Sequence, residues 1–419
     1  MNIRTATITG VPKELHAGDA ARGVQHAGGV AAGADAADLR ARVDRVAAVA
    51  AAHAAAVDAQ SRFPSEAIAA ARAERLLSLA VPRELGGEGC AAADVVDGCY
   101  ALGRACASTA MIYAMHQTKV ACLVRHGRGS PWHQLLLRRL CAEQLLLASS
   151  TTEGHGGGDV RNSSAAIDGE IRITLERQAT VISYGEAADG IVTTARRSAH
   201  AVSSDQVLVA FLKENYTLER LNGWDALGMR GTCSAGFRFV ASGLREQILP
   251  VSYEKIHSHT MMPFAHLAWS AAWAGIAAAA VDRTRAFVRK AAHRAGGKLP
   301  PAAAHLTRAA ASLRTLRSLI TAALGRFEAA AADAAVLESV DFQTGMNMLK
   351  VNASELAVAT VMSAMQACGL AGYVNDSEFS IGRHLRDIMS SPIMISNDRI
   401  LANVAAASLL SGAPASLRG

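Results

Sequence analysis

Apolar residues recur at helical spacing over most of the chain, and this periodicity predicts a mainly helical protein. Residues 37–80 are expected to form two helices separated by the Phe63-Pro64-Ser65 break, because proline is favoured in the first turn of a helix. Two further helical runs are predicted at 95–121 and 132–147. The N-terminal third therefore reads as a helical domain.

After residue 148 the pattern changes to short β-branched runs separated by Gly, Asp and Asn, which predict strands. Helical periodicity returns after Tyr253 and predicts long helices at 265–294, 302–332, 341–369 and 397–410. This order predicts a mainly α protein with an inserted β-domain. The expected parts are a flexible tail, an N-terminal helical domain, a middle β-domain and a C-terminal helical bundle, at 1–36, 37–147, 148–256 and 257–412.

Composition narrows the class of protein without naming a function. The chain has 419 residues, 51% of them apolar, which is enough for a large core. Its net charge of +6 comes from basic residues interleaved with acids and without aromatic partners, so nucleic-acid binding is not expected. Seven scattered cysteines suggest free thiols in a reducing compartment, and the apolar runs are too short or interrupted to predict export or membrane insertion. We therefore expect a cytoplasmic protein.

The stretch 366–400 contains three motifs in close succession: QACGLAGY, GRHLRD and PIMISNDRI. Together they resemble the C-terminal signature of the acyl-CoA dehydrogenase family, whose members carry a catalytic acid just before the final helix. The matching positions are Gln366, Gly369, Gly372, Tyr373, Arg383, Arg386 and Asp387. The position aligned with the acid is Ile395. The resemblance implies a scaffold with a middle β-barrel or sheet domain and a C-terminal four-helix bundle, without the usual base.

Three more segments resemble family motifs: SSTTEGHGGGDVRNS at 149–163, VISYG at 181–185 and LGMRGTCS at 227–234. The resemblance implies FAD as cofactor and a homodimer or homotetramer in which the 366–373 turn contacts a neighbouring subunit's FAD. VISYG resembles a strand of the family and is expected as one, and its Val181 replaces the family's flavin-shielding aromatic residue. By resemblance, Thr151, Thr152, Ser183, Arg289, Gln366, Gly369 and Gly372 are cofactor-binding candidates, and Gly158 and Ser234 are substrate-binding candidates.

A dehydrogenase on this scaffold needs a substitute for the missing acid, since a base must remove the α-proton of the acyl group. Asp398, three residues after Ile395, is the first candidate, although an acid there could equally stabilise a helix N-terminus. His266 and Glu153 come after Asp398 as substitutes, and His116 is a candidate that could instead be a core residue. His257 and His259 suggest an exposed loop, and no metal site is predicted.

Three functions stay open at this point. The first is FAD-dependent α,β-dehydrogenation of an acyl group carried on CoA or a carrier protein, with an external electron acceptor. The second is a flavin-dependent monooxygenase or N-oxygenase supplied by a flavin reductase, which needs no carboxylate base and suits the changes at Val181 and Ile395. The third is a scaffold protein without redox activity.

Overall fold

The computed structural model describes residues 29–153 and 160–410. Helix α1 (Gly29–Gln60) begins within the predicted tail, and residues 1–28 of that tail lie outside the described part. The break at Phe63-Pro64-Ser65 is present, because α1 ends at Gln60 and α2 (Ser65–Ala73) starts directly after Pro64. Both predicted helices and the break between them are therefore present, although α2 ends at Ala73 and not near residue 80.

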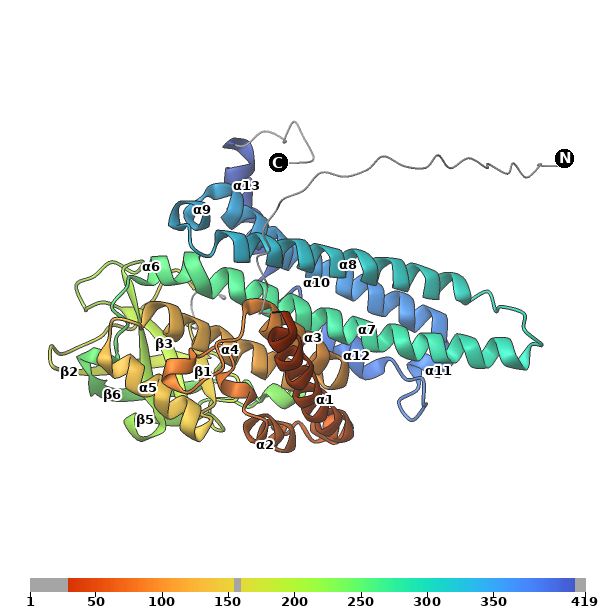
Figure 1. Ribbon diagram of the computed structural model, residues 1–419, viewed down its shortest axis with the longest axis horizontal. Helices are drawn as coiled ribbons and strands as arrows, with labels where there is room; N and C mark the ends of the chain where they lie inside the picture. The colour runs from red at the N-terminus through yellow and green to blue at the C-terminus, as the bar shows by residue number, and fades with distance from the viewer. Residues whose placement is uncertain (1–28, 154–159, 411–419) are drawn as a thin grey trace, which may run out of the picture. The chain divides into compact units, whose positions relative to one another are not determined.

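The next two predictions need correction. The single helix predicted at 95–121 is two helices, α3 (Ala92–Ala105) and α4 (Ala107–His126), because Cys106 between them adopts an extended backbone (Figure 1). The helix predicted at 132–147 is α5 (Pro131–Glu143), which ends early because Gln144 takes a left-handed conformation with φ of 51°. The residues that follow form strand β1 (Leu147–Ser150) instead.

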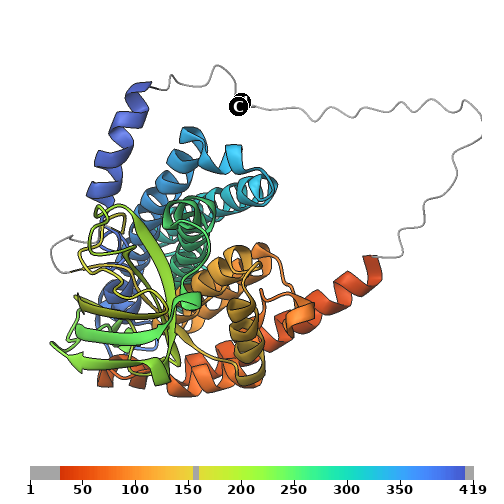
Figure 2. The same ribbon diagram turned by 90° about the vertical axis from the view of Figure 1, so that its left-hand side faces the viewer.

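The β-domain consists of two three-stranded sheets (Figure 2). One has the order β1-β3-β4, with β3 (Gly190–Arg196) and β4 (Gln206–Leu212); β1 pairs parallel to β3 and the other pair is antiparallel. The other is antiparallel with the order β2-β6-β5, formed by β2 (Arg172–Ala179), β6 (Phe237–Leu244) and β5 (Tyr216–Arg220).

Two details of the β-domain differ from the sequence prediction. Strand β5 was not predicted, because its polar and exposed residues lack a clear alternation. The 181–185 segment was expected as a strand but forms a turn, in which Tyr184 has a positive φ of 44°. Short 3₁₀ turns occur at Leu76–Ser78, Arg83–Leu85, Lys213–Asn215, Arg230–Thr232 and Arg245–Gln247.

The C-terminal part is a helical bundle centred on α7 (Met262–Arg294) (Figure 1). Helices α3 and α7 approach closely through glycines: a Cβ on Gly275 would lie 2.3 Å from the carbonyl oxygen of Tyr100. A short helix α6 (Tyr253–Ile256) and a π-helical segment at His257–Met261 lead into α7. The other helices are α8 (Ala303–Ala330), α9 (Ala334–Glu338), α10 (Val340–Cys368), α11 (Leu370–Tyr373), α12 (Gly382–Ile388) and α13 (Asn397–Leu410).

The continuous helical stretch Tyr253–Arg294 is long and apolar enough to cross a membrane by length and composition. However, 89% of its most apolar window is buried inside the protein, as expected for the central helix of a bundle. Its hydrophobicity is therefore accounted for by packing against α3, α4, α8 and α10.

Candidate functional site

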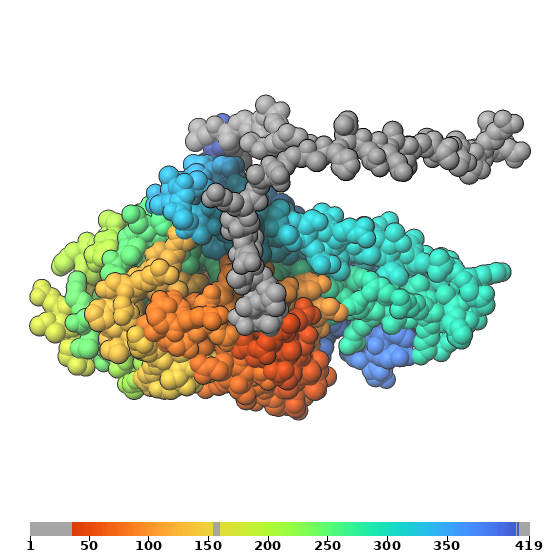
Figure 3. Space-filling view, viewed as in Figure 1, coloured from red at the N-terminus to blue at the C-terminus, as the bar shows by residue number. Residues whose placement is uncertain are grey.

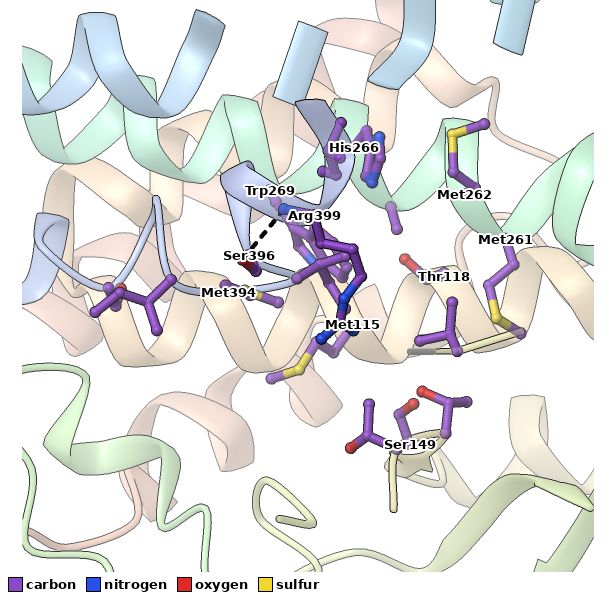
Figure 4. Close-up of a pocket in the computed structure, with 18 of the residues that line it drawn as sticks. Met115, Thr118, Ser149, Met261, Met262, His266, Trp269, Met394, Ser396 and Arg399 are labelled. Carbon is purple, nitrogen blue, oxygen red and sulfur yellow. Dashed lines mark hydrogen bonds between the residues drawn. The ribbon is translucent and has the colours of Figure 1, made fainter. Parts of the chain in front are cut away.

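A cavity of about 1010 Å³ lies where the helices and the β-domain meet. This volume is at the upper end of the range of about 300–1,000 Å³ typical of small-molecule sites. Its wall is drawn from α4, β1, the turn before β6, the start of α7, and the loop between α12 and α13 (Figure 4). Elements far apart in the sequence thus enclose one space large enough for a cofactor ring and a substrate.

The wall contributed by α4 is a helical stripe. Met111, Met115, Thr118 and Lys119 follow the i, i+4, i+7, i+8 spacing that places side chains on one face of a helix. Other methionines line the same cavity: Met229, Met261, Met262, Met389 and Met394. Because methionine is unbranched and polarizable, this wall can adapt to apolar ligands of irregular shape.

A chain of hydroxyl groups reaches the cavity from the turn before β6. Thr232 Oγ1 donates to the carbonyl oxygen of Met229 at 2.8 Å and lies 2.8 Å from Ser234 Oγ, which lies 2.7 Å from Ser183 Oγ. Since Thr232 uses its proton on Met229, Ser234 donates to Thr232 and Ser183 donates to Ser234. Ser183 therefore presents lone pairs to the cavity, where it would accept a hydrogen bond from a ligand N–H.

The segment after β1 brings three predicted residues to the cavity, because Thr151, Thr152 and Glu153 line it. The candidate Gly158 lies outside the described residues. Glu153 accepts hydrogen bonds from Ser163 Oγ and from the backbone N–H of Ser164, and it pairs with the buried Arg177. Burial raises the pKa of Glu153, but Arg177 and these donors outweigh it and hold the pKa below the ordinary value. An ionised, fully engaged carboxylate of this kind is a weak base.

His266 also lines the cavity, together with Trp269 one turn further along α7 (Figure 4). Nδ1 of His266 donates to the carbonyl oxygen of Met346 at 2.9 Å, which leaves Nε2 as the acceptor. Burial lowers the pKa of His266 to about 3, so the ring is neutral at physiological pH. His266 can accept a hydrogen bond from a ligand, but it is a poor proton acceptor for chemistry.

The loop that carries the catalytic acid in the family is strained at the aligned position, Ile395. Ile395 lines the cavity with φ of 52°, a conformation in which a β-branched residue is an outlier. Such strain costs about 1–3 kcal/mol and tends to occur at functional sites. Asp398 is exposed in the first turn of α13 and is not part of the described cavity wall, whereas Arg399 beside it is. The structure therefore supports the helix N-terminal role of Asp398 rather than the role of substitute base.

His116 is not on the described cavity wall and has a core role instead. Its Nε2 donates to the carbonyl oxygen of Leu77 at 2.7 Å, and its Nδ1 accepts from the backbone N–H of Leu147 at 3.0 Å. The ring is completely buried, and burial lowers its pKa to about 4. With both nitrogens occupied, His116 ties α4 to β1 and has no capacity left for catalysis.

The expectation of an exposed loop at His257 and His259 is wrong. Both lie in the π-helical segment, and His259 is buried with Nε2 2.8 Å from Glu338 Oε1. No group of three His, Cys, Asp or Glu side chains within the described ranges could hold a metal ion.

A second group of predicted cofactor residues lies elsewhere in the bundle. Arg289 lies near the end of α7, Gln366 lies near the end of α10, and Gly369 and Gly372 lie at α11; none of them lines the cavity. The space-filling view shows the blue surface of the α11 region beside the turquoise surface of the long bundle helices (Figure 3). Gly372 of α11 is buried against the end of α10, because a Cβ there would lie 2.6 Å from Cys368 Cβ. The sequence thus predicted two separate sets of residues, of which only the first surrounds the cavity.

Other wall residues could not be found from the motifs alone. Trp269 and Arg399 occupy no matched motif position, and the stripe of Met115 and Lys119 on α4 is visible in sequence only as helical spacing within an alanine-rich run. The available signal was the polar pair Thr118 and Lys119 on the same face as Met111 and Met115.

Comparisons with known proteins agree with this architecture. Residues 34–144 match the family model "Acyl-CoA dehydrogenase, N-terminal domain", and residues 259–410 match "Acyl-CoA dehydrogenase, C-terminal domain". A probable acyl-CoA dehydrogenase of Mycobacterium leprae (strain TN) is 33% identical over 123 residues, which span 28% of this chain and only 31% of that relative.

Two solved structures share the fold. The dibenzothiophene monooxygenase TdsC of Paenibacillus sp. A11-2, in complex with FMN and indole, superposes with a TM-score of 0.78 at 18% identity, covering 91% of this chain and 98% of TdsC. The nitrososynthase of Micromonospora carbonacea var. africana gives a TM-score of 0.74 at 21% identity, with 90% and 96% of the two chains covered. With both terminal domains matched and the fold in common, the chain belongs to the acyl-CoA dehydrogenase family.

Proposed function

We propose that this protein is a flavin-dependent monooxygenase that uses the acyl-CoA dehydrogenase scaffold without its proton-abstraction chemistry. The observation that carries this proposal is the state of the acids around the cavity. Ile395 stands at the aligned base position, and the two carboxylates on the described wall, Glu153 and Glu338, are engaged by Arg177 and His259. Oxygen transfer requires no carboxylate base, whereas α-proton removal does.

The cavity residues fit a flavin ring. Trp269 Nε1 is buried and has no hydrogen-bond partner among the described residues, although a buried indole N–H usually finds one. Ser183 offers an acceptor from the hydroxyl chain, and Thr151 and Thr152 add further hydroxyls. A flavin carries both carbonyl oxygens and an N–H on its ring, so Trp269, Ser183, Thr151 and Thr152 would hold it from complementary sides.

We propose FMN as the bound form, because Arg289, the candidate for the adenine end of FAD, does not line the cavity within one protomer. The 366–373 turn, expected at a neighbouring subunit's FAD, does not line this cavity either. FAD would then need a second subunit, and the exposed Leu370 and Tyr373 of α11 offer an apolar surface for one. We propose a homo-oligomer with FMN in each cavity, and the flavin released on denaturation should run as FMN in chromatography.

When bound in reduced form, the flavin supplies two electrons to dioxygen, so that one oxygen atom enters the substrate and the other leaves as water. The protein's own contribution is to bind and orient the ligand and to exclude water from it. The methionine-rich wall removes bulk solvent from the ligand, and the neutral His266 offers Nε2 to a donor on it. A separate flavin reductase would supply the electrons.

The second candidate is the dehydrogenation of an acyl thioester on CoA or a carrier protein, with electrons leaving to an external acceptor. It is favoured by the match of both terminal domains to acyl-CoA dehydrogenase models and by the presence of Thr151 and Thr152 at the cavity. It lacks a placed base, because Asp398 is exposed and Glu153 is engaged.

One pair of measurements separates the two functions. The protein with its flavin is mixed anaerobically with a panel of acyl-CoAs and acyl-carrier-protein thioesters, and flavin absorbance is followed. In parallel, flavin is reduced by a reductase under ¹⁸O₂ with a panel of aromatic, thioether and amine acceptors, and products are examined by mass spectrometry. The monooxygenase proposal expects no bleaching by thioesters and ¹⁸O in at least one product.

The variant Ile395→Glu serves as a matched comparison, because it restores a carboxylate at the cavity wall. If thioesters bleach the flavin of Ile395→Glu but not that of the wild type, the wild type lacks only the catalytic base of a dehydrogenase. Bleaching of the wild-type flavin by any thioester would overturn the monooxygenase proposal in favour of the dehydrogenase.

A further inference from the structure

Lys119 is a buried amine on the cavity wall that none of the family motifs includes. It lies on α4, only 3% of its surface is exposed, and it belongs to the same helical stripe as Met115 and Thr118. Its Nζ contacts Met261 Sδ at 3.6 Å. Met261 also lines the cavity and is labelled in Figure 4. The ammonium group therefore sits at the cavity wall rather than at the protein surface.

Within the described residues, the charge of Lys119 has no acidic counterpart. A lysine ammonium has three donors, and the contact supplied by those residues is a thioether, which is a weak acceptor. The charged groups that act on it are Arg177, which is also cationic, and the Cys122 thiol one turn along α4. Burial, and secondarily Arg177, lower the pKa of Lys119 to about 8, so the group is still mostly protonated at pH 7.

A buried cation facing a cavity in this way is costly unless something in the cavity compensates for it. The two carboxylates on the described wall do not do so, because Glu153 binds Arg177 and two backbone N–H groups, and Glu338 binds His259. Met261 has a flexible side chain, so its sulfur can yield to a stronger acceptor. An anionic oxygen in its place would form a charge-assisted hydrogen bond with Nζ.

We propose that Lys119 is a specificity-determining residue that binds an anionic oxygen of the substrate, a carboxylate or an equivalent phosphate or sulfonate, while the methionine wall holds an apolar body. The substrate class is therefore an amphipathic acid of small size. This inference rests on the proposed function in taking the cavity as the substrate site. The inference concerns the acidic end of the substrate, which Lys119 binds, and it does not specify the reaction at the other end.

The test compares probes that differ only in charge. Octanoate, octanesulfonate and neutral octanamide are titrated into the flavin-loaded protein, and binding is followed by tryptophan fluorescence, since Trp224 and Trp269 line the cavity. We expect both anions to bind about ten- to a hundredfold more tightly than the amide, as for a hydrogen bond to a charged group. In Lys119→Met this preference should disappear, while Lys119→Arg should retain most of it.

Lys298→Met is the matched control, because it removes the same charge from an exposed loop residue. It should leave the preference for anions unchanged. If Lys119→Met does not fold, the comparison of octanoate with octanamide in the wild type and in Lys119→Arg still decides the matter. Equal binding of acid and amide, or an anion preference that persists in Lys119→Met, would overturn the proposal.

The flavin phosphate is another possible source of the anion, and flavin content distinguishes it. We expect Lys119→Met to be purified with the same flavin content as the wild type. Loss of flavin together with an unchanged probe preference would assign Lys119 to the cofactor and overturn the substrate role. Because probe binding needs no turnover, the preference for acids can hold even if the ¹⁸O experiment fails, so the two failures are distinguishable.

Discussion

Replacing Asp387 with Asn should stabilise this protein, and more strongly at pH 8 than at pH 5. Asp387 lies in α12, is 5% exposed, and accepts a hydrogen bond of 2.7 Å from the backbone N–H of Met229. This contact fixes the turn that carries Met229 to the cavity wall, where Gly228 packs against the carbonyl of Arg386. An asparagine oxygen can accept the same hydrogen bond without the charge.

The size of the effect follows from the pKa. Burial raises the pKa of Asp387 from 3.8 to about 6, even though the Met229 N–H and two nearby arginines favour ionisation. Since a tenfold change in proton affinity corresponds to about 1.4 kcal/mol, the ionised carboxylate costs the folded state about 3 kcal/mol once both states are ionised. Asparagine resembles the protonated acid and avoids this cost.

The dependence on pH has a definite sign. Between about pH 4 and pH 6 the folded protein keeps a proton that the unfolded chain has released, so this carboxyl's contribution to stability falls as the pH rises through that window. The advantage of Asp387→Asn should therefore be about 3 kcal/mol at pH 8 and roughly half as large at pH 5.

Chemical denaturation of the two proteins at both pH values measures this difference. The control is Asp398→Asn, because Asp398 is exposed at the start of α13 and should lose only about 0.3–1 kcal/mol, with little change between the two pH values. If Asp387→Asn is destabilised at pH 8 by as much as at pH 5, the carboxylate is needed in its charged form and the reasoning fails.

Three other substitutions test separate features. Gly275→Ala should destabilise the protein by about 1–3 kcal/mol in thermal unfolding, because its Cβ would meet the Tyr100 carbonyl at 2.3 Å; an unchanged melting temperature would contradict the close helix crossing. His116→Leu should cost about 2–4 kcal/mol at neutral pH, since it leaves the Leu77 carbonyl and the Leu147 N–H buried without partners, and denaturant titration would show this. Ser183→Ala should leave the melting temperature of the flavin-free protein within about 1 °C while weakening flavin binding severalfold in a fluorescence titration; equal affinity would remove Ser183 from the flavin site.

Much of the fold could be predicted from the sequence because helical periodicity is strong and continuous. The break at Pro64 and helix α13 at Asn397–Leu410 were placed correctly from spacing and start signals alone. The predicted helix bounds were wrong where a single residue leaves the helical backbone conformation. Cys106 splits α3 from α4 and Gln144 ends α5, and neither residue is a sequence signal for a helix end.

The candidate site was predictable where motifs carry it and not where packing does. Ser183, Ser234 and His266 were singled out from sequence and all reach the cavity. Asp398 was chosen for its nearness to Ile395 along the chain. Its side chain does not line the cavity, whereas that of the next residue, Arg399, does, because consecutive side chains of a helix point in directions about 100° apart. Direction around a helix axis depends on tertiary contacts, and sequence distance does not report it.

The π-helical segment at His257–Met261 has a consequence for how this chain can change by insertion and deletion. A π-helix holds one residue more per hydrogen-bonded turn than an α-helix, and each residue of an α-helix turns the chain by about 100°. Deleting one residue here would restore a regular helix while rotating α6 relative to α7. Tyr253 and Ile256, both buried, would then leave the core, and His259 would turn away from Glu338. A deletion of one residue in this segment would therefore rebuild the edge of the cavity, whereas the same deletion in an exposed loop would not.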